Sequence, residues 1–183
     1  MALRLEPLNR SHRPLLADFQ NPQGSLVEYL TRYALRHAEK DLLARTYLAL
    51  DAGMGTPRLA GYFSLATVSV DRAAVARLPE LDRLPRFPIP GILLARLAVD
   101  TRVRGQGLGR YLFEAALGLT LQLAQAGPVA FRLFVADALD AGAAQFYQHF
   151  GLAPLGDDFP CRMVLDLRPL LAGRSPPRPG RPA

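Results

Sequence analysis

The chain has little of the chemistry that holds metals or cross-links a fold. It has no tryptophan and one cysteine among 183 residues. One cysteine excludes a disulfide framework and a zinc site built from several cysteines. The three histidines, His12, His37 and His149, lack the spacing of a ligand set, so no metal is expected. Cys161 has no histidine–aspartate pattern around it and is expected to be a small packing residue.

Long apolar runs are also missing. The longest apolar stretches are interrupted by charge or glycine well before a membrane-spanning length. The N-terminal segment MALRLEPLNR contains no apolar run, which argues against a secretory signal peptide. With a single thiol, the expected compartment is the cytoplasm.

Lysine is almost absent, although the net charge is +6. Of 22 basic residues, only Lys40 is a lysine. Arginine makes flat, bidentate contacts with phosphate or carboxylate, which points to an anionic partner, but a GC-rich genome gives the same bias. The charge is also local: residues 83–110 hold six arginines against Asp100, and residues 172–183 hold three more.

Half of the residues are hydrophobic, and the length is that of a single domain. We expect this domain to cover residues 1–171. The last segment, 172–183, contains four prolines and three arginines and almost nothing to bury, so it is expected to be a disordered tail.

Hydrophobic periodicity predicts an alternation of strands and helices. Ser25 and Glu28 form a capping-box pattern that predicts a helix start at Ser25. The other expected elements, in order, are strands at 46–50 and 59–70, a short helix within 71–82, a buried strand at 92–99, a helix at 108–126, a strand at 129–136, a helix at 141–150 and a strand at 162–167. This order predicts an α/β or α+β sheet covered by helices.

A glycine-rich turn joins the buried strand to the helix that follows it. Free backbone N–H groups at a helix start favour a phosphate, and glycines let it approach, so the turn is a candidate diphosphate cradle. The alternative is a turn that only closes the joint between strand and helix. A nucleotide P-loop is excluded because its Gly-Lys pair is absent, and a dinucleotide-binding fold is disfavoured because the spacing is Gly-x-Gly-x-Gly.

The turn resembles a known family. Arg104-Gly-Gln-Gly107-Leu-Gly109 matches the Arg/Gln-x-x-Gly-x-Gly/Ala signature of the GCN5-related N-acetyltransferases (GNAT). Ala144-Gln-Phe-Tyr147-Gln-His-Phe-Gly151 is similar to a second element of that family. The resemblance implies a mixed, mostly antiparallel sheet, splayed at an acetyl-CoA site and flanked by helices.

The resemblance also implies a set of site residues. Tyr147 would be the general acid that protonates the sulfur of CoA. The residues implied in binding acetyl-CoA are Leu97, Ala98 and Val99 on the strand, Arg104, Gly105, Gln106, Gly107, Leu108, Gly109 and Arg110 in the turn, and Asp140. Glu28, Glu39 and Asp100 remain unranked as general base, and Asp100 is also expected to cap the turn.

Upstream segments resemble a narrower group. Arg45-Thr-Tyr-Leu-Ala, Ala60-Gly-Tyr-Phe-Ser-Leu and Leu94-Ala-Arg-Leu-Ala-Val-Asp100 are similar to GNAT toxins of bacterial toxin–antitoxin pairs. That likeness implies acetylation of aminoacyl-tRNA, a small ribbon-helix-helix antitoxin, a homodimer, and RNA contacts at Arg83, Arg86 and Arg96. The alternatives are a GNAT enzyme for a small-molecule or protein amine, and a CoA-binding module without turnover.

Overall fold

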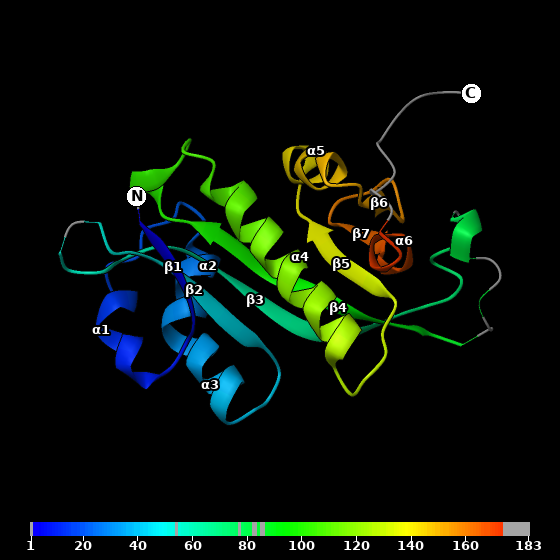
Figure 1. Ribbon diagram of the computed structural model, residues 1–183. Coiled ribbons are helices and arrows are strands. Elements are labelled where there is room, and N and C mark those ends of the chain that lie inside the picture. The colour runs from blue at the N-terminus through cyan, green and yellow to red at the C-terminus, as the bar shows by residue number, and fades with distance from the viewer. Residues whose placement is uncertain (1, 54, 77, 82–83, 85–86, 174–183) are drawn as a thin grey trace. The chain divides into compact units, whose positions relative to one another are not determined.

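The computed structural model describes residues 2–53, 55–76, 78–81, 84 and 87–173. Arg83, Arg86 and the tail from residue 174 onward therefore lie outside the described residues. The chain divides into two compact units, residues 1–66 with 94–118, and residues 67–93 with 119–183. Two strands, β3 (Arg58–Val70) and β4 (Ile89–Val99), contribute to both units (Figure 1).

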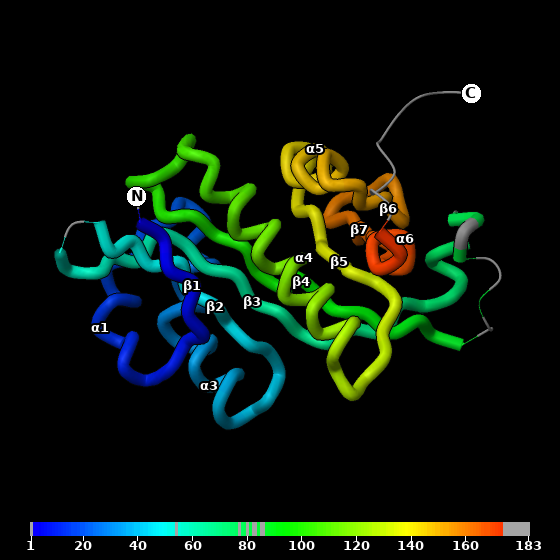
Figure 2. Tube along the Cα trace, viewed as in Figure 1, coloured from blue at the N-terminus to red at the C-terminus, as the bar shows by residue number. Residues whose placement is uncertain are grey.

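The first unit is built on antiparallel strands. In it, β1 (Leu3–Pro7) pairs with β2 (Arg45–Asp51), and β2 pairs with β3 through a register that shifts between Ala49 and Leu50. Figure 2 traces these three strands side by side. The helices of this unit are α1 (Arg13–Leu16), α2 (Gly24–Glu28), a π-helical turn (Tyr29–Tyr33), α3 (Ala34–Glu39) and the first part of α4 (Leu108–Ala126).

Helices cover both faces of β3, as two neighbouring residues of that strand show. Successive side chains of a strand point to opposite faces. At Gly61, a Cβ atom would lie 2.8 Å from Leu112 of α4 and 2.8 Å from the carbonyl oxygen of Ala98 on β4. The next residue, Tyr62, donates its hydroxyl to the carbonyl of Leu26 on α2 at 2.7 Å. Hence α4 and α2 lie on opposite faces, and only glycine lets α4 and β4 come this close at position 61.

The second unit contains the remaining strands and helices. Its strands are β5 (Leu133–Ala138), β6 (Ala153–Pro154) and β7 (Cys161–Asp166), and its helices α5 (Ala141–His149) and α6 (Leu167–Leu171). The strand order is β1-β2-β3-β4-β5-β7-β6, and both β5 and β6 run antiparallel to β7. A core of aliphatic side chains, Val70, Val75, Leu81, Ile89, Leu133, Val135 and Val164, holds this unit together.

The predicted fold class is confirmed as a mixed α/β fold with a mostly antiparallel sheet and flanking helices. One local prediction was wrong. Helix α2 begins at Gly24 after Gln23, and no side chain caps it, so Ser25 lies inside the helix rather than at its cap. The short helix expected within 71–82 is a 3-10 helix at Pro79–Leu81, and the described residues before it form turns. The sequence reading also missed β1 and α1, which are too short to show a clear period.

None of the helices among the described residues is both long and apolar enough to cross a membrane. Within the same residues, no cluster of His, Cys, Asp and Glu side chains has the arrangement of a metal site.

Candidate active site

The glycine-rich turn has the backbone shape that a phosphate cradle needs. Gly105 and Gly107 have φ values of +76° and +78°, a region that other residues rarely adopt. No heavy atom lies within 4 Å of the position where either glycine would carry a Cβ, so the turn is open on that side. Helix α4 begins at Leu108, and its first N–H groups have no carbonyl partner within the helix. Together these features form an anion-binding concavity.

This turn and the end of β4 line one hollow of about 520 Å³ in the first unit. Its lining residues are Asn21, Pro22, Gln23, Leu26, Leu97, Ala98, Val99, Arg104, Gly105, Gly107, Leu108 and Gly109. The structure thus brings together most of the residues predicted to bind acetyl-CoA. It adds Asn21, Pro22, Gln23 and Leu26, from a segment that the sequence did not assign to the site. Gln106 and Arg110 are not among the lining residues, although Gln106 lies between Gly105 and Gly107 in the sequence and Arg110 follows Gly109. Arg110 forms an ion pair with Glu114 at 2.8 Å.

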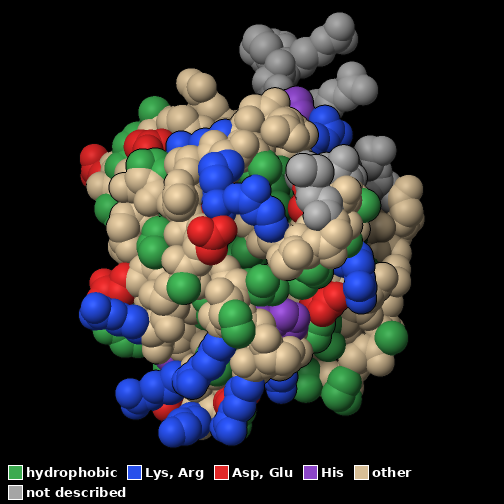
Figure 3. Space-filling model, turned by 90° about the vertical axis from the view of Figure 1, so that its left-hand side faces the viewer, with side chains coloured by type: hydrophobic (Ala, Val, Ile, Leu, Met, Phe, Trp, Pro, Cys, Tyr) green, Lys and Arg blue, Asp and Glu red, His purple; other side chains and the backbone are tan. Residues whose placement is uncertain are grey.

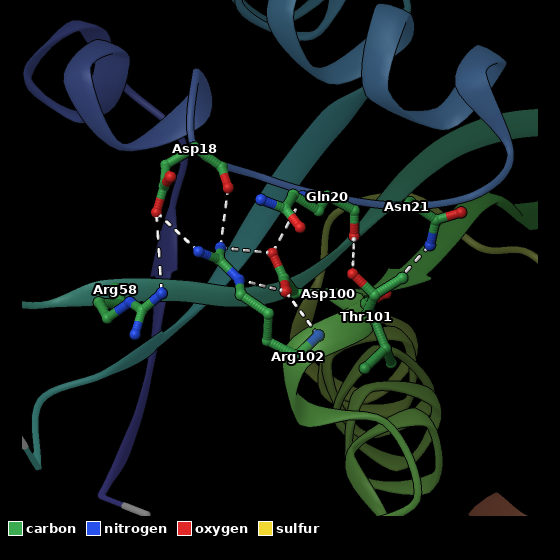
Figure 4. Close-up of polar contacts among 8 residues, drawn as sticks. Asp18, Gln20, Asn21, Arg58, Asp100, Thr101 and Arg102 are labelled. Atoms are coloured by element: carbon green, nitrogen blue, oxygen red, sulfur yellow. Dashed lines mark hydrogen bonds and ion pairs between the residues drawn. The ribbon is translucent and has the colours of Figure 1, made fainter.

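A buried carboxylate ties the added segment to β4. Asp100 is 1% exposed and accepts the backbone N–H of Gln20 at 3.0 Å (Figure 4). In the reverse direction, the N–H of Thr101 donates to the carbonyl of Gln20, and the side-chain amide of Asn21 donates to the carbonyl of Val99 at 3.0 Å. Residues about eighty positions apart in the sequence are thereby fixed beside the hollow.

Arg102 completes this polar cluster. Its guanidinium contacts Asp100 through Nε at 2.8 Å and Nη2 at 2.7 Å, and Asp18 through Nη1 at 2.9 Å (Figure 4). Burial by itself would raise the pKa of Asp100, but the hydrogen bonds from Arg102 and from the N–H of Gln20 outweigh it and lower that pKa. Asp100 also caps the 3-10 turn after β4 by accepting the N–H of Arg102, as predicted. Asp100, with a lowered pKa and with its carboxylate held by Arg102, is poorly suited to act as a general base.

Tyr62 holds one lining residue of the hollow, Leu26, in place. Its hydroxyl holds the carbonyl of Leu26, a lining residue, and its ring lies 5.5 Å from that of Phe19, centroid to centroid.

Replacing Tyr62 by phenylalanine is expected to lower the free energy of unfolding by about 1 kcal/mol, because one hydrogen bond to a partly buried carbonyl is lost. Urea denaturation measures this change. The control is Tyr33→Phe, since Tyr33 is 42% exposed and its loss is expected to have no effect. Equal stabilities of the Tyr62 and Tyr33 variants would contradict a role for this bond.

Tyr147 lies in the second unit, on α5. Its ring contacts that of Phe146 edge to face at 5.5 Å, and Phe146 contacts Phe150 in the same way. Desolvation by the surrounding residues, together with the negative charge of Asp137, raises the pKa of the Tyr147 phenol to about 12. The phenol therefore keeps its proton throughout the neutral range.

The other predicted residues have clear local partners. Asp140 caps α5 by accepting the N–H of Ala143 at 2.8 Å. Glu28 pairs with Arg32 on the same helix, and Glu39 pairs with Arg10. Arg96 lies over the ring of Tyr29, 5.0 Å from its centroid. Cys161 is buried, consistent with a packing role.

A β-strand that runs into a glycine cradle at a helix N-terminus is an arrangement suited to the diphosphate of a cosubstrate. The sequence profile of the acetyltransferase (GNAT) domain matches residues 60–151, which include β4, the cradle and Tyr147. The chain therefore belongs to the GNAT acetyltransferases, enzymes that transfer the acetyl group of acetyl-CoA to an amine.

Individual relatives agree with this family. The chain is 34% identical over 136 residues to the tRNA-acetylating toxin of Mycobacterium tuberculosis, which covers 74% of this chain and 76% of the toxin. Its fold is similar to that of AtaT complexed with acetyl-methionyl-tRNAfMet, with a TM-score of 0.81, 24% identity and coverage of 92% and 97% of the two chains. AtaTR bound with acetyl-CoA has a TM-score of 0.74, 25% identity and coverage of 90% and 93%.

Proposed function

We propose that this chain is an acetyl-CoA-dependent N-acetyltransferase for the α-amine of aminoacyl-tRNA, of the toxin type. The observation that carries this proposal is the 34% identity with the tRNA-acetylating toxin over three quarters of both chains. The hollow between the cradle and residues 21–26 supports it, because it joins the acetyl-CoA loop to a separate segment that is available to an acceptor.

In this proposal acetyl-CoA lies along the end of β4. The free N–H groups of Gly107, Leu108 and Gly109, with the charge of Arg104, receive its diphosphate. The backbone at Leu97–Val99 receives the pantetheine arm, and an N–H there stabilises the oxyanion that forms on the thioester carbonyl. The resemblance to the family also assigns Gln106, Arg110 and Asp140 to acetyl-CoA binding.

The neutral α-amine attacks the thioester carbon, a C–N bond forms and the C–S bond breaks. Tyr147 donates its phenol hydrogen to the departing sulfur. A phenol with a pKa of about 12 is a weaker acid than a thiol, whose pKa is about 8.5. The phenol therefore stabilises the developing thiolate mainly as a hydrogen-bond donor. The proton lost by the attacking nitrogen ends on the CoA sulfur, so the products are the amide and the CoA thiol.

The same proposal covers organisation and partners. Residues 1–171 act as one catalytic domain, two copies associate as a homodimer, and a small ribbon-helix-helix antitoxin holds the enzyme inactive. Because charged tRNA and acetyl-CoA occur together in the cytoplasm, we place the enzyme there.

The test is incubation of the protein with labelled acetyl-CoA and a mixture of charged tRNAs. Label is expected on the aminoacyl group of one or more isoacceptors, and it is expected to fall to background with Tyr147→Phe. Label on a small-molecule or protein amine, without label on tRNA, would show that this amine is the acceptor and that aminoacyl-tRNA is not. Binding of acetyl-CoA without any acetyl transfer would show that the protein is a CoA-binding module without turnover.

A further inference from the structure

A basic groove lies on the first unit, outside the hollow described above. It has a volume of about 360 Å³ and is formed by the segment around α1 on one side and by the helical residues 31–40 on the other. Five of its nine lining residues are basic, namely Arg10, Arg13, Arg32, Arg36 and Lys40. Leu16, Thr31, Leu35 and Glu39 complete it. Figure 3 shows Lys and Arg side chains gathered at the lower end of this face, at the level of α1 and α3 in Figure 1.

Each wall of the groove presents a row of positive charge. Arg32, Arg36 and Lys40 follow one another at intervals of four residues and so lie along one side of their helical segment. Arg10 and Arg13 stand three residues apart on the opposite wall. An ion pair from Arg10 Nε to Glu39 Oε2, at 2.8 Å, connects the two walls.

Most of the donors on these side chains remain available. Arg10, Arg32 and Arg36 each have an ion pair through one nitrogen with Glu39, Glu28 and Asp41, respectively, and these arginine side chains are 65% to 75% exposed. A guanidinium has five N–H donors, so one such contact leaves the others free. The side chains of Arg13 and Lys40 have no hydrogen-bond or ion-pair partner among the described residues. The groove therefore offers clustered, solvent-exposed donors, as phosphate recognition requires.

One helical segment connects this groove to the acyl-transfer hollow. Leu26 lines the hollow and Arg36 lines the groove, and both belong to the helical residues 24–39. Ten residues at about 1.5 Å per residue separate them by about 15 Å. A nucleic-acid strand advances about 3.4 Å per nucleotide, so this distance corresponds to roughly four nucleotides.

We propose that this groove binds the phosphates of the acceptor strand of the tRNA, about four nucleotides from the aminoacylated end. The inference rests on the proposed function, which places that end in the hollow. The groove then determines affinity for the RNA without contacting the reacting atoms. The acidic segment of a protein partner is the competing occupant, and the arrangement along one helix favours RNA.

The test compares two doubly neutralised variants. Arg13→Gln with Lys40→Gln removes two groove charges that have no partner. Arg4→Gln with Arg168→Gln removes two exposed charges elsewhere and is the matched control. For each protein, the dissociation constant of tRNA is measured by filter binding from 50 to 300 mM salt, and KM and kcat with charged tRNA are determined.

The groove variant is expected to bind tRNA about tenfold more weakly, and its slope of log K against log salt is expected to fall by about 2, one unit per phosphate contact. KM for charged tRNA is expected to rise about tenfold, while KM for acetyl-CoA and kcat stay within twofold. Identical affinities and slopes for the groove and control variants would overturn the inference.

Two further outcomes separate the explanations. If wild type binds polyglutamate and only the groove variant loses that binding, while both bind tRNA equally, the groove belongs to an acidic partner and the RNA assignment is wrong. If wild type transfers no label to any charged tRNA, the proposed function fails, and the groove inference fails with it. Transfer with unchanged KM in the groove variant overturns the groove inference alone.

Discussion

Tyr147→Phe is expected to lower kcat by about 10²- to 10³-fold, the usual contribution of one positioned hydrogen-bond donor to a developing anion, and to leave the affinity for acetyl-CoA unchanged. The substitution removes one hydroxyl and keeps the ring that contacts Phe146. The residues that bind acetyl-CoA in our proposal are unchanged in this variant, so calorimetry is expected to give the same dissociation constant for both proteins. Tyr33→Phe is the control, since it removes a phenol that is 42% exposed.

The pH profile sharpens this prediction. Because the pKa of Tyr147 is raised to about 12, the wild-type rate is not expected to fall between pH 7 and 10 through loss of the phenol proton. The rate is expected to decline on the acidic side, where the acceptor amine becomes protonated. An unchanged kcat in Tyr147→Phe, or a wild-type rate that falls with an apparent pKa near 8, would remove Tyr147 from its role.

Arg102→Met is expected to destabilise the fold by about 3 kcal/mol at pH 7, because it leaves the carboxylate of Asp100 buried without its counterion. Asp100 is 1% exposed and its side chain receives two contacts from this guanidinium. The backbone N–H groups of Gln20 and Arg102 still donate to Asp100 in this variant. The loss of stability is therefore expected at the lower end of the range for a broken buried ion pair. The control is Arg58→Met. Among the described residues, the side chain of Arg58 makes a single exposed ion pair, of 3.9 Å with Asp18, and its loss is expected to cost less than about 1 kcal/mol.

The sign of the pH dependence differs between the two proteins. In wild type the pKa of Asp100 lies below its ordinary value of 3.8, so its stabilisation is complete above that pH and is lost as pH falls through the folded pKa. In Arg102→Met the largest favourable contact is gone, and burial raises the pKa of Asp100. The stability difference is therefore expected to be largest near pH 7 and to shrink toward pH 4. Urea denaturation between pH 4 and pH 7 measures this difference in the free energy of unfolding. A difference that does not change with pH would contradict the role given to the Asp100–Arg102 ion pair.

The same variant tests how the hollow is held. Residues 20 and 21 are fixed to the end of β4 through Asp100, Thr101 and Val99. Loosening this connection is expected to raise KM for acetyl-CoA, whereas Arg58→Met leaves it unchanged.

Local signals were sufficient for much of the fold. Helix α4 was predicted at 108–126, where it lies, because its period is long and Gly127-Pro128 ends it. Strand β4 was found as an apolar run, although it begins at Ile89 rather than Ile92. The strand expected at 129–136 is β5, which lies at Leu133–Ala138. A short apolar run indicates that a strand is present, but it does not give the exact ends of that strand. The capping box at Ser25 was wrong because the helix begins one residue earlier, without a side-chain cap.

The sequence by itself determined the cradle, because its shape is a property of consecutive residues: glycines at 105 and 107 adopt the positive φ that the turn needs, and α4 begins directly after them. It also indicated Tyr147, through the pattern around it. Only the tertiary structure decided that Asn21, Pro22, Gln23 and Leu26 line the hollow, since the hydrogen bonds of Gln20 and Asn21 that hold this segment cross about eighty residues. It likewise collected five basic residues, from Arg10 to Lys40, into one groove, while the sequence pointed to residues 83–110. The physical reason is that propensity and capping act within a few residues, whereas burial and ion pairing depend on which segments the packed sheet brings side by side.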